Sequence, residues 1–387
     1  MSGSPRLHRR LIAVALRSPA FAAFLFLCAP AHAADVRVAG PKPVAGYGHS
    51  ITALPDGRIL SYGGTLQTQV WSPERRNWEA PRPGTFGGQR RFHTATLTSD
   101  GRVVLAGGVW VGPMSQSVAL ATSETWHPDS NRWERGATLL FPRFGHTATA
   151  LPGGDVLLVG GAAVTLDDKP VAPFLRSVER LSANSSRQMR SAGVARSNHT
   201  ATLLSDGRVL VVGGVGEDGV PVALVEIYDP AKDLWATAAP LRTARADHTA
   251  TLLSDGKVLV VGGRPLPLAR TATAEIWNPG SGEWTDAPPL AQSRSGHSAT
   301  LLNNGSVLVA GGRELENQGA LAVERLPANG ERWELSASLP TQLPYPHSVL
   351  LPNGNVLLFG LTPYSPDAGP FVWLPKSEPR TRFSARW

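Results

Sequence analysis

Cysteine is almost absent from this chain of 387 residues. The single cysteine, Cys28, lies within the first 33 residues, so the remainder can contain neither a disulfide framework nor thiol chemistry. The apolar stretch from Pro19 to Leu27 is shorter than the roughly 20 residues that a membrane-spanning helix needs. Charged residues make up only 17% of the chain, without runs of like charge, heptads or low-complexity tracts. These absences exclude disulfide-rich, membrane-spanning and coiled-coil classes.

The basic charge is concentrated at the amino terminus. Residues 1–33 contain four arginines and no acidic residue, which leaves +3 of the formal charge of +7 for the remainder. Such a balance gives no reason to expect nucleic-acid binding. The arginines, the apolar stretch and the small residues at Ala31 and Ala33 are typical of a secretory signal peptide. We expect cleavage after Ala33 and a periplasmic or secreted protein, expected to be a monomer without a membrane span.

A histidine introduces each of seven similar segments along the chain. The spacing between successive histidines is 44 to 53 residues, which indicates one supersecondary unit repeated in tandem. Two copies, HTATLLSDGRVLVVGG from His199 and HTATLLSDGKVLVVGG from His248, differ at one residue. The histidines are His49, His93, His146, His199, His248, His297 and His347.

Each unit has the pattern of four strands. An Asp-Gly, Asn-Gly or Gly-Gly turn separates two apolar runs, which indicates a type I′ hairpin. The second run, such as Val209 to Val212, is continuously apolar, as expected for a strand buried on both faces. In six copies two glycines follow, and a third strand then carries Glu and an aromatic residue. A further Trp comes seven residues later, as in Trp277 and Trp284, and predicts an outer fourth strand.

These features resemble the kelch family of β-propellers. The resemblance covers residues 46 to 387 and implies an all-β ring of seven blades, each of four antiparallel strands. We expect one domain over residues 34–387. Its blades would begin near residues 46, 90, 143, 196, 245, 294 and 344.

Features shared by all copies are better explained by structure than by function. We expect each histidine to satisfy backbone groups at the start of an inner strand. Five arginines, three residues before their histidines, match five glutamates on third strands, which favours structural ion pairs over an anion-binding ring. The arginines are Arg90, Arg143, Arg196, Arg245 and Arg294, and the glutamates are Glu124, Glu179, Glu226, Glu275 and Glu324.

Functional residues are expected where the copies differ. The resemblance implies binding at one face, through the loops after the diglycines and the segments that lead into the inner strands. Arg264 and Arg313 occupy one position on adjacent blades, and together they suit a carboxylate of an acidic sugar or peptide. Trp110, in a long loop, could stack on a sugar. The predicted ligand-binding residues are Tyr47, Arg91, Trp110, Asn198, Asp247, Arg264, Arg313 and Tyr345.

Named catalytic motifs are missing from the sequence. A galactose-oxidase-like copper site, known in kelch-type propellers, needs a cysteine cross-linked to tyrosine, so we expect neither that site nor any other metal or cofactor. Two hypotheses follow. The preferred one is an exported, non-catalytic module that binds a glycan or protein partner. The alternative is a periplasmic epimerase or mutarotase for an acidic sugar, similar to sialic-acid epimerases, with Asp247 or His248 as the acid–base residue.

Closure of the ring needs an outer strand for the seventh blade. Thr381 to Ala385 and Val36 to Val38 are both candidates, and we favour the carboxyl-terminal segment.

Overall fold

The computed structural model describes residues 35–38, 48–63, 68–72, 74–75, 77–79, 90–111, 117–163, 174–313, 320–360 and 370–375. The predicted signal peptide, Tyr47 and Thr381–Ala385 lie outside these residues. Within the described ranges every regular element is a β-strand, and no helix long and apolar enough to cross a membrane is found there.

The strands form seven four-stranded antiparallel sheets and one smaller sheet of three strands. Seven innermost strands follow the repeated histidines, except that the last one includes it: β2 (Ser50–Ala53), β7 (Thr94–Leu97), β13 (Thr147–Ala150), β17 (Thr200–Leu203), β21 (Thr249–Leu252), β25 (Ser298–Leu301) and β29 (His347–Leu350). The second strands are β3 (Ile59–Tyr62), β8 (Val103–Ala106), β14 (Val156–Val159), β18 (Val209–Val212), β22 (Val258–Val261), β26 (Val307–Ala310) and β30 (Val356–Phe359).

The remaining strands lie toward the rim. The third strands are β4 (Gln69–Ser72), β11 (Ser123–His127), β15 (Val178–Leu181), β19 (Val225–Asp229), β23 (Ala274–Trp277), β27 (Ala322–Leu326) and β31 (Phe371–Leu374). The outer strands are β5 (Asn77–Glu79), β12 (Arg132–Arg135), β16 (Ser186–Met189), β20 (Leu234–Thr237), β24 (Trp284–Ala287), β28 (Glu334–Ser338) and β1 (Asp35–Val38). The small sheet contains β6 (Arg90–Arg91), β9 (Val109–Val111) and β10 (Ser117–Ala119).

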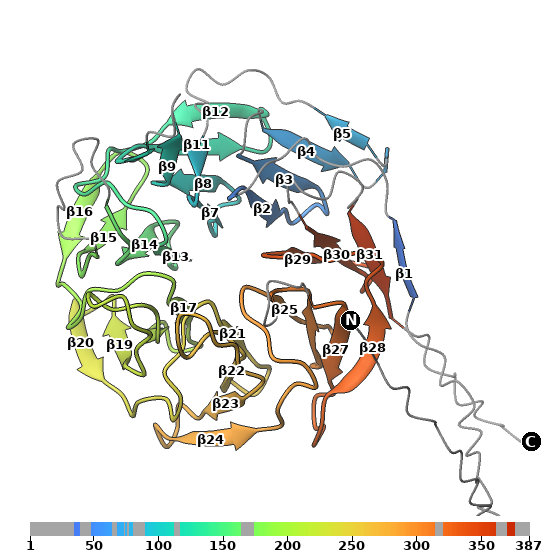
Figure 1. Cartoon of the computed structure of the whole chain (residues 1–387). Helices are drawn as coiled ribbons and strands as arrows, with labels where there is room; N and C mark the ends of the chain where they lie inside the picture. Colours follow the sequence, from blue (N-terminus) through green and yellow to red (C-terminus); the bar gives the residue numbers. More distant parts are fainter. Residues whose placement is uncertain are drawn as a thin grey trace, which may run out of the picture. The chain divides into compact units, whose positions relative to one another are not determined.

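The innermost strands are arranged in a closed cycle. Each contacts the innermost strands of the preceding and following sheets, and β2 contacts β29. Figure 1 shows the resulting ring, with successive sheets side by side. The expectation of an all-β propeller built from four-stranded antiparallel sheets is therefore confirmed.

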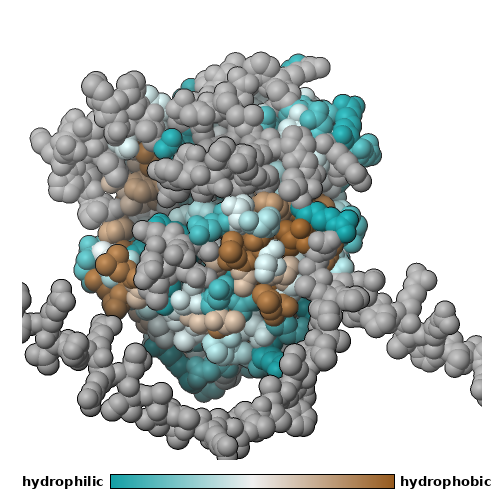
Figure 2. Space-filling view, turned by 45° about the vertical axis from the view of Figure 1, so that its right-hand side comes forward, coloured by the Kyte–Doolittle hydropathy of each residue, from teal (hydrophilic) through white to brown (hydrophobic). Residues whose placement is uncertain are grey.

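The core lies between neighbouring sheets. All four residues of each second strand are buried, as their continuous apolar sequence predicts. Leu210 and Val212 pack in one cluster with Val258 and Trp277 of the next sheet. The seven-residue spacing of the aromatic residues has a direct cause, because Trp277 lies opposite Trp284 across adjacent strands. At the molecular surface in Figure 2, hydrophobic residues form separate patches divided by hydrophilic ones.

The seventh sheet is closed by the amino-terminal strand, so the preference for a carboxyl-terminal outer strand is wrong. β1 pairs antiparallel with β31, with Val36 opposite Trp373 and Val38 opposite Phe371. Val36 also packs against the apolar cluster that contains Trp373. Both candidate segments, Val36 to Val38 and Thr381 to Ala385, alternate apolar and polar residues. The sequence pattern therefore could not show which of them pairs with β31.

Candidate functional site

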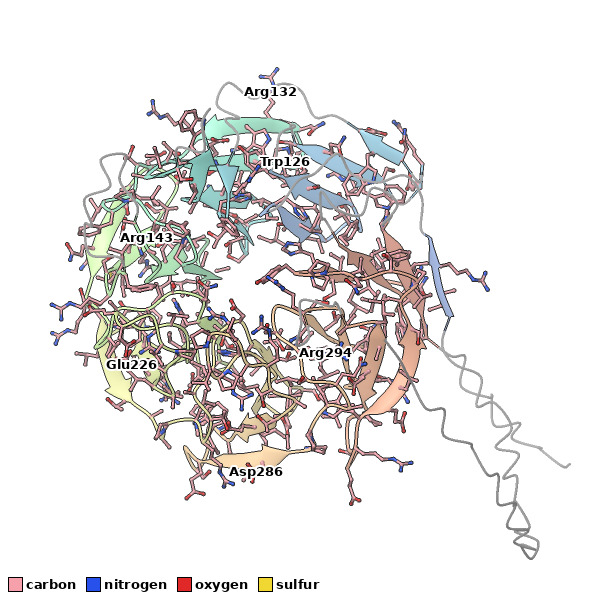
Figure 3. The ribbon with its side chains drawn as sticks, viewed as in Figure 1. Trp126, Arg132, Arg143, Glu226, Asp286 and Arg294 are labelled. Atoms are coloured by element: carbon pink, nitrogen blue, oxygen red, sulfur yellow. The ribbon has the colours of Figure 1, made fainter. Side chains whose placement is uncertain are left out.

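The repeated arginines and glutamates form buried ion pairs within their own repeats, as predicted. The pairs are Arg90–Glu124 (2.6 Å), Arg143–Glu179, Arg196–Glu226, Arg245–Glu275 (2.7 Å) and Arg294–Glu324 (2.5 Å). Figure 3 shows Arg143 and Arg294 inside the ring, whereas Arg132 extends from the rim. These five pairs therefore belong to the framework.

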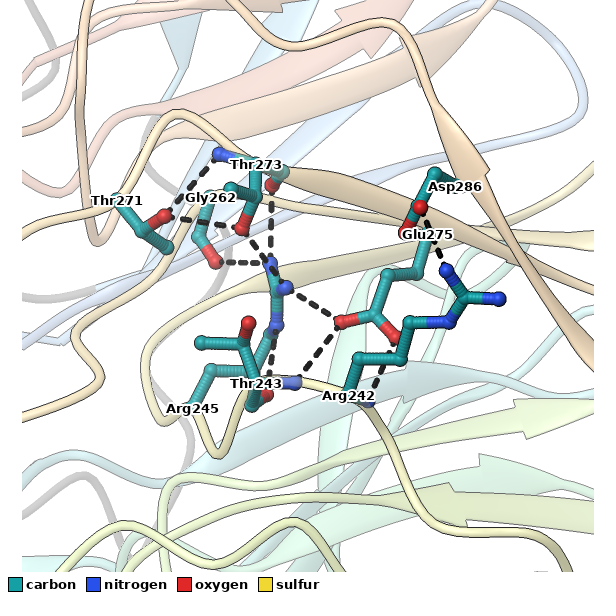
Figure 4. A network of polar contacts seen from close by, with 8 residues as sticks. All are labelled: Arg242, Thr243, Arg245, Gly262, Thr271, Thr273, Glu275 and Asp286. Carbon is teal, nitrogen blue, oxygen red and sulfur yellow. Dashed lines mark hydrogen bonds and ion pairs between the residues drawn. The ribbon is translucent and has the colours of Figure 1, made fainter.

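Each pair also holds backbone groups in place. In the fifth repeat Arg245 donates to the carbonyl oxygens of Gly262 (2.8 Å) and Thr273 (3.0 Å) (Figure 4). Glu275 accepts the backbone N–H of Arg242 at 2.8 Å, which fixes the segment arriving from the preceding sheet. The ion pair thus joins the diglycine, the third strand and the connection between sheets.

The repeated histidines join neighbouring sheets through hydroxyl groups. Nε2 of His248, for example, lies 2.9 Å from Oγ1 of Thr200 in the preceding innermost strand. The expected contact with backbone is found at His347, whose Nε2 lies 3.1 Å from the carbonyl oxygen of His49. The other hydroxyl pairs are Ser50–His93, Thr94–His146, Thr147–His199 and Thr249–His297. For these five histidines a Thr or Ser side chain supplies a partner that the sequence analysis did not predict.

In five of the six diglycine pairs the first glycine lies against the next histidine, and in the sixth Gly311 lies against Leu343 and Pro346. A Cβ added to Gly213 would lie 2.4 Å from the carbonyl oxygen of Arg245 and 2.9 Å from Cε1 of His248. Gly213 also has a φ of 61°, in the left-handed region. The diglycine is thus required for close contact between sheets.

A series of backbone hydrogen bonds runs around one mouth of the central channel and is interrupted at the seventh repeat, where Pro346 has no N–H to donate. From the second repeat to the sixth, the residue directly before the histidine donates its N–H to the carbonyl oxygen of the equivalent residue in the preceding repeat, with N···O distances between 2.8 and 3.4 Å. All of these residues have positive φ. We call them the collar: Gly48, Phe92, Gly145, Asn198, Asp247 and Gly296. The side of the propeller that carries them is the collar face.

The loops after the diglycines and the segments that lead into the inner strands, where the copies differ, meet at this face. The residue after the diglycine pairs with the residue two before the histidine of the same repeat, as Arg264 does with Ala246 and Arg313 with Ser295. Nε of Arg264 then donates to Oδ2 of the collar residue Asp247 at 2.6 Å. Nδ2 of Asn198 donates to Oδ1 of the same carboxylate at 2.7 Å. The structure thus brings Asn198, Asp247 and Arg264 together.

Arg313 and Tyr345 form a second group beside the first. The guanidinium carbon of Arg313 lies 6.0 Å from the centre of the Tyr345 ring, within the range of a cation–π contact. The ring of Tyr345 packs over Gly296, where an added Cβ would lie 2.5 Å from its carbon atoms. Gly296 in turn donates its N–H to the carbonyl oxygen of Asp247 at 2.8 Å. The group of Arg313 and Tyr345 and the group of Asn198, Asp247 and Arg264 are therefore neighbours on the collar face.

A hollow of about 270 Å³ opens beside these groups at the channel mouth. Phe92 and Tyr345 contribute its aromatic lining, and 41% and 38% of their surfaces are exposed. The other lining residues are Gly48, His49, His93, Gly296, His297, Pro346 and His347.

Two predicted ligand residues belong to the second repeat and lie away from Asn198, Asp247 and Arg264. Arg91 nevertheless directly precedes the hollow residue Phe92, and a Cβ added to Gly48 would lie 2.8 Å from Cβ of Arg91. Trp110 is on β9, where it pairs with Arg90, and Arg91 on β6 pairs with Val109. Both belong to the small sheet of the second repeat, whose innermost strand does not neighbour that of the fifth. Tyr47 lies outside the described residues.

Two residues of the site escaped the sequence analysis. Arg270 is in a loop whose length and composition are not repeated, so no periodic signal marked it. Phe92 did carry a signal, because it is a large aromatic residue at a position where five other repeats have Gly, Asn or Asp.

The structure gives no support to His248 as an acid–base residue. His248 is buried and bonded to Thr200, and burial, reinforced by the charge of Arg245, lowers its pKa to about 3. It is therefore neutral at pH 7 and cannot reach solvent. Both carboxylate oxygens of Asp247 are occupied, by Arg264 and Asn198. Within the described ranges no group of three His, Cys, Asp or Glu residues is suitably placed for a metal.

The ring of antiparallel sheets, closed by inter-sheet hydrogen bonds, defines a β-propeller. The family model "Kelch motif" matches residues 195–242, which is the fourth repeat. The solved structure entitled "Structure of YjhT" superposes with a TM-score of 0.61 and 14% identity, over 76% of this chain and 98% of that one. This similarity concerns the fold.

Curated proteins with kelch repeats are similar over part of the chain. Beta-scruin of Limulus polyphemus is 30% identical over 139 residues, which are 35% of this chain and 15% of the scruin. Kelch-like protein 35 of Mus musculus is 28% identical over 175 residues, or 44% of this chain and 27% of that protein. The matched regions are thus well under two thirds of either relative. Together with the repeats and the fold, these matches support a relationship to kelch-repeat proteins.

Proposed function

We propose that this kelch-repeat protein is an exported, non-catalytic binding module that holds a sugar residue of a glycan at its collar face. The observation that carries the proposal is the hollow of about 270 Å³ flanked by the exposed rings of Phe92 and Tyr345. Small-molecule sites are concave and usually lined by apolar and aromatic groups. Aromatic side chains offer a flat apolar face on which a sugar ring can stack.

The framework around the hollow is rigid, which favours binding at low entropic cost. The collar hydrogen bonds fix the backbone on which Phe92 is placed, and Gly296 supports the ring of Tyr345. A ligand that enters the hollow therefore meets rings that are already oriented. Binding explains the collar face better than catalysis, because His248 is buried and Asp247 is held in an ion pair.

A protein partner is a second candidate, favoured by one observation. The loop after β22 exposes 58% of Leu266 and 89% of Leu268, next to Arg264 on the collar face. Exposed apolar side chains next to cationic groups suit a protein surface with apolar and acidic residues.

Sugar binding can be tested by ligand-observed NMR with a panel of neutral and acidic sugars. Phe92→Asn and Tyr345→Asn remove the rings, and asparagine tolerates the positive φ of 56° and 51° at these positions. We expect each variant to weaken binding about tenfold or more. Leu335→Ala, at an exposed residue of the outer strand β28, is the control and should bind as the parent does. Binding that survives both asparagine variants would refute the proposed site.

A further inference from the structure

Arg270 is a cation whose Nε is buried without a hydrogen-bond partner among the described residues. It lies in the loop between β22 and β23, and its Nη1 donates to the carbonyl oxygen of Ala269 at 2.8 Å. No carboxylate in the described part of the chain forms an ion pair with it. The framework arginines differ from it, because each of them has a glutamate partner.

The backbone brings Arg270 close to both Arg264 and Arg313. Thr271, the next residue, donates its N–H to the carbonyl oxygen of Gly263 at 3.0 Å. Thr271 also accepts the N–H of Arg294 at 3.2 Å, in the segment whose Ser295 pairs with Arg313. The backbone of Arg270 therefore lies beside Arg264 of its own repeat. It also lies beside the segment of the next repeat that pairs with Arg313.

The three cations lie close enough to affect one another. Burial and then the charge of Arg313 lower the pKa of Arg270, and Arg264 lowers it less, while Tyr345 and Asp247 act in the opposite direction. Like charges brought together on a half-buried surface repel, and an anion between them relieves the repulsion.

The cluster already holds one carboxylate. Arg264 binds Asp247 through Nε, while its two terminal nitrogens make no hydrogen bond with the described residues. A guanidinium presents its donors in a plane, which matches a planar carboxylate. Tyr345 lines the hollow and also lies under Arg313, so a ligand in the hollow can extend a substituent toward the cluster.

We propose that Arg270, together with Arg264 and Arg313, forms a carboxylate-binding subsite at the edge of the hollow. This inference rests on the proposed function and adds that the ligand carries a carboxylate. Arg270 supplies the donor that the protein does not use internally, and Arg264 and Arg313 add charge. The carboxylate can come from a sugar acid or from an acidic peptide, which have this group in common.

The test compares ligands that differ in charge but little in shape. Ligand-observed NMR titrations of the full chain, at low salt, use galacturonate, its uncharged methyl ester, N-acetylglutamate amide and inorganic phosphate. We expect galacturonate to bind about tenfold more tightly than the ester, because a hydrogen bond to a charged group is stronger than one to a neutral group. Arg270→Ala should abolish this preference, and Arg270→Lys should retain part of it.

The matched control is Arg132→Ala, which removes an equal charge from the rim of the propeller, where Figure 3 shows Arg132 extending outward. It should leave the preference for galacturonate unchanged. An unchanged preference in Arg270→Ala, with a normal thermal melt, overturns the inference.

The other outcomes separate the inference from the proposed function. Equal binding of galacturonate and its ester, lost in Tyr345→Asn, overturns the carboxylate subsite and leaves the sugar-binding hollow in place. Tighter binding of N-acetylglutamate amide, dependent on Arg270, supports the subsite and identifies a peptide as the source of the carboxylate. Preferential binding of phosphate, or no binding by any carboxylate probe, overturns the subsite.

Discussion

The imidazole of His347 contacts the carbonyl oxygen of His49 at 3.1 Å and so joins the last innermost strand to the first. The two rings also meet edge to face, with their centres 5.0 Å apart. At the five junctions from β2 to β25 a Thr or Ser hydroxyl of the preceding strand occupies this place, and β25 and β29 are joined instead by Thr300 and Ser348. The junction between the two ends of the ring is therefore built differently from the other contacts between sheets.

Ring closure predicts a different effect for truncation at each end. Deletion of residues 34–38 removes β1 and exposes the edge of β31, so the melting temperature should fall sharply. Deletion of residues 381–387 should change it little. Thermal unfolding followed by circular dichroism provides the measurement, and the opposite ranking of the two truncations contradicts closure by β1.

The buried histidines predict a loss of stability in acid. Burial lowers the pKa of His93 and of His248 to about 3, below the ordinary value of 6.5 in the unfolded chain. Between these values the unfolded state binds more protons, so stability is complete above pH 6.5 and declines as the pH falls toward 3. Each such histidine contributes about 1.4 kcal/mol per pH unit in this window. Urea unfolding at several pH values should show a smaller slope for His248→Gln.

A buried framework pair should be far more sensitive to substitution than an exposed pair in the same repeat. Glu275→Gln leaves Arg245 as an uncompensated buried charge and should cost about 3–5 kcal/mol. The exposed pair Arg242–Asp286, 2.6 Å apart, is the control, and Asp286→Asn should cost under about 1 kcal/mol. Equal effects in urea unfolding would exclude a structural role specific to the buried pair.

Alanine substitutions at two glycines of the fourth repeat distinguish the cost of a steric clash from the cost of backbone strain. Gly207→Ala places its Cβ in open space at a φ of 85° and should cost only the strain of about 1–2 kcal/mol. Gly213→Ala adds a contact of 2.4 Å with the carbonyl oxygen of Arg245 and should cost several kcal/mol more. Thermal melts of the two variants provide the comparison, and similar melting temperatures contradict the close packing.

Export can be tested by sequencing the mature protein. Cleavage after Ala33 predicts Ala34 as the first residue of protein recovered from the periplasm or medium. Such a cut leaves β1, which begins at Asp35, intact. Recovery of the uncleaved chain only from the cytoplasm contradicts the predicted signal peptide.

Repetition made the framework predictable. An arginine and a glutamate that recur together in five copies, such as Arg245 and Glu275, were predicted to pair with each other. The structure confirms this pairing. The histidines were predicted to be structural, but their partners were not, because Thr200 and His248 lie 48 positions apart and meet only when two sheets pack.

The strands, the four-stranded units and their order along the chain could be predicted from the residues alone, because hairpin turns and buried apolar strands are local and recur at a nearly constant period. Three features became visible only in the folded chain: β1 closes the ring, Phe92 and Tyr345 flank one hollow, and Arg270 lies near both Arg264 and Arg313. The physical reason is that these contacts join residues of different repeats. The repeat pattern predicts the residues that all copies share. The candidate site is formed by residues that differ between the copies, and their contacts depend on how the repeats pack.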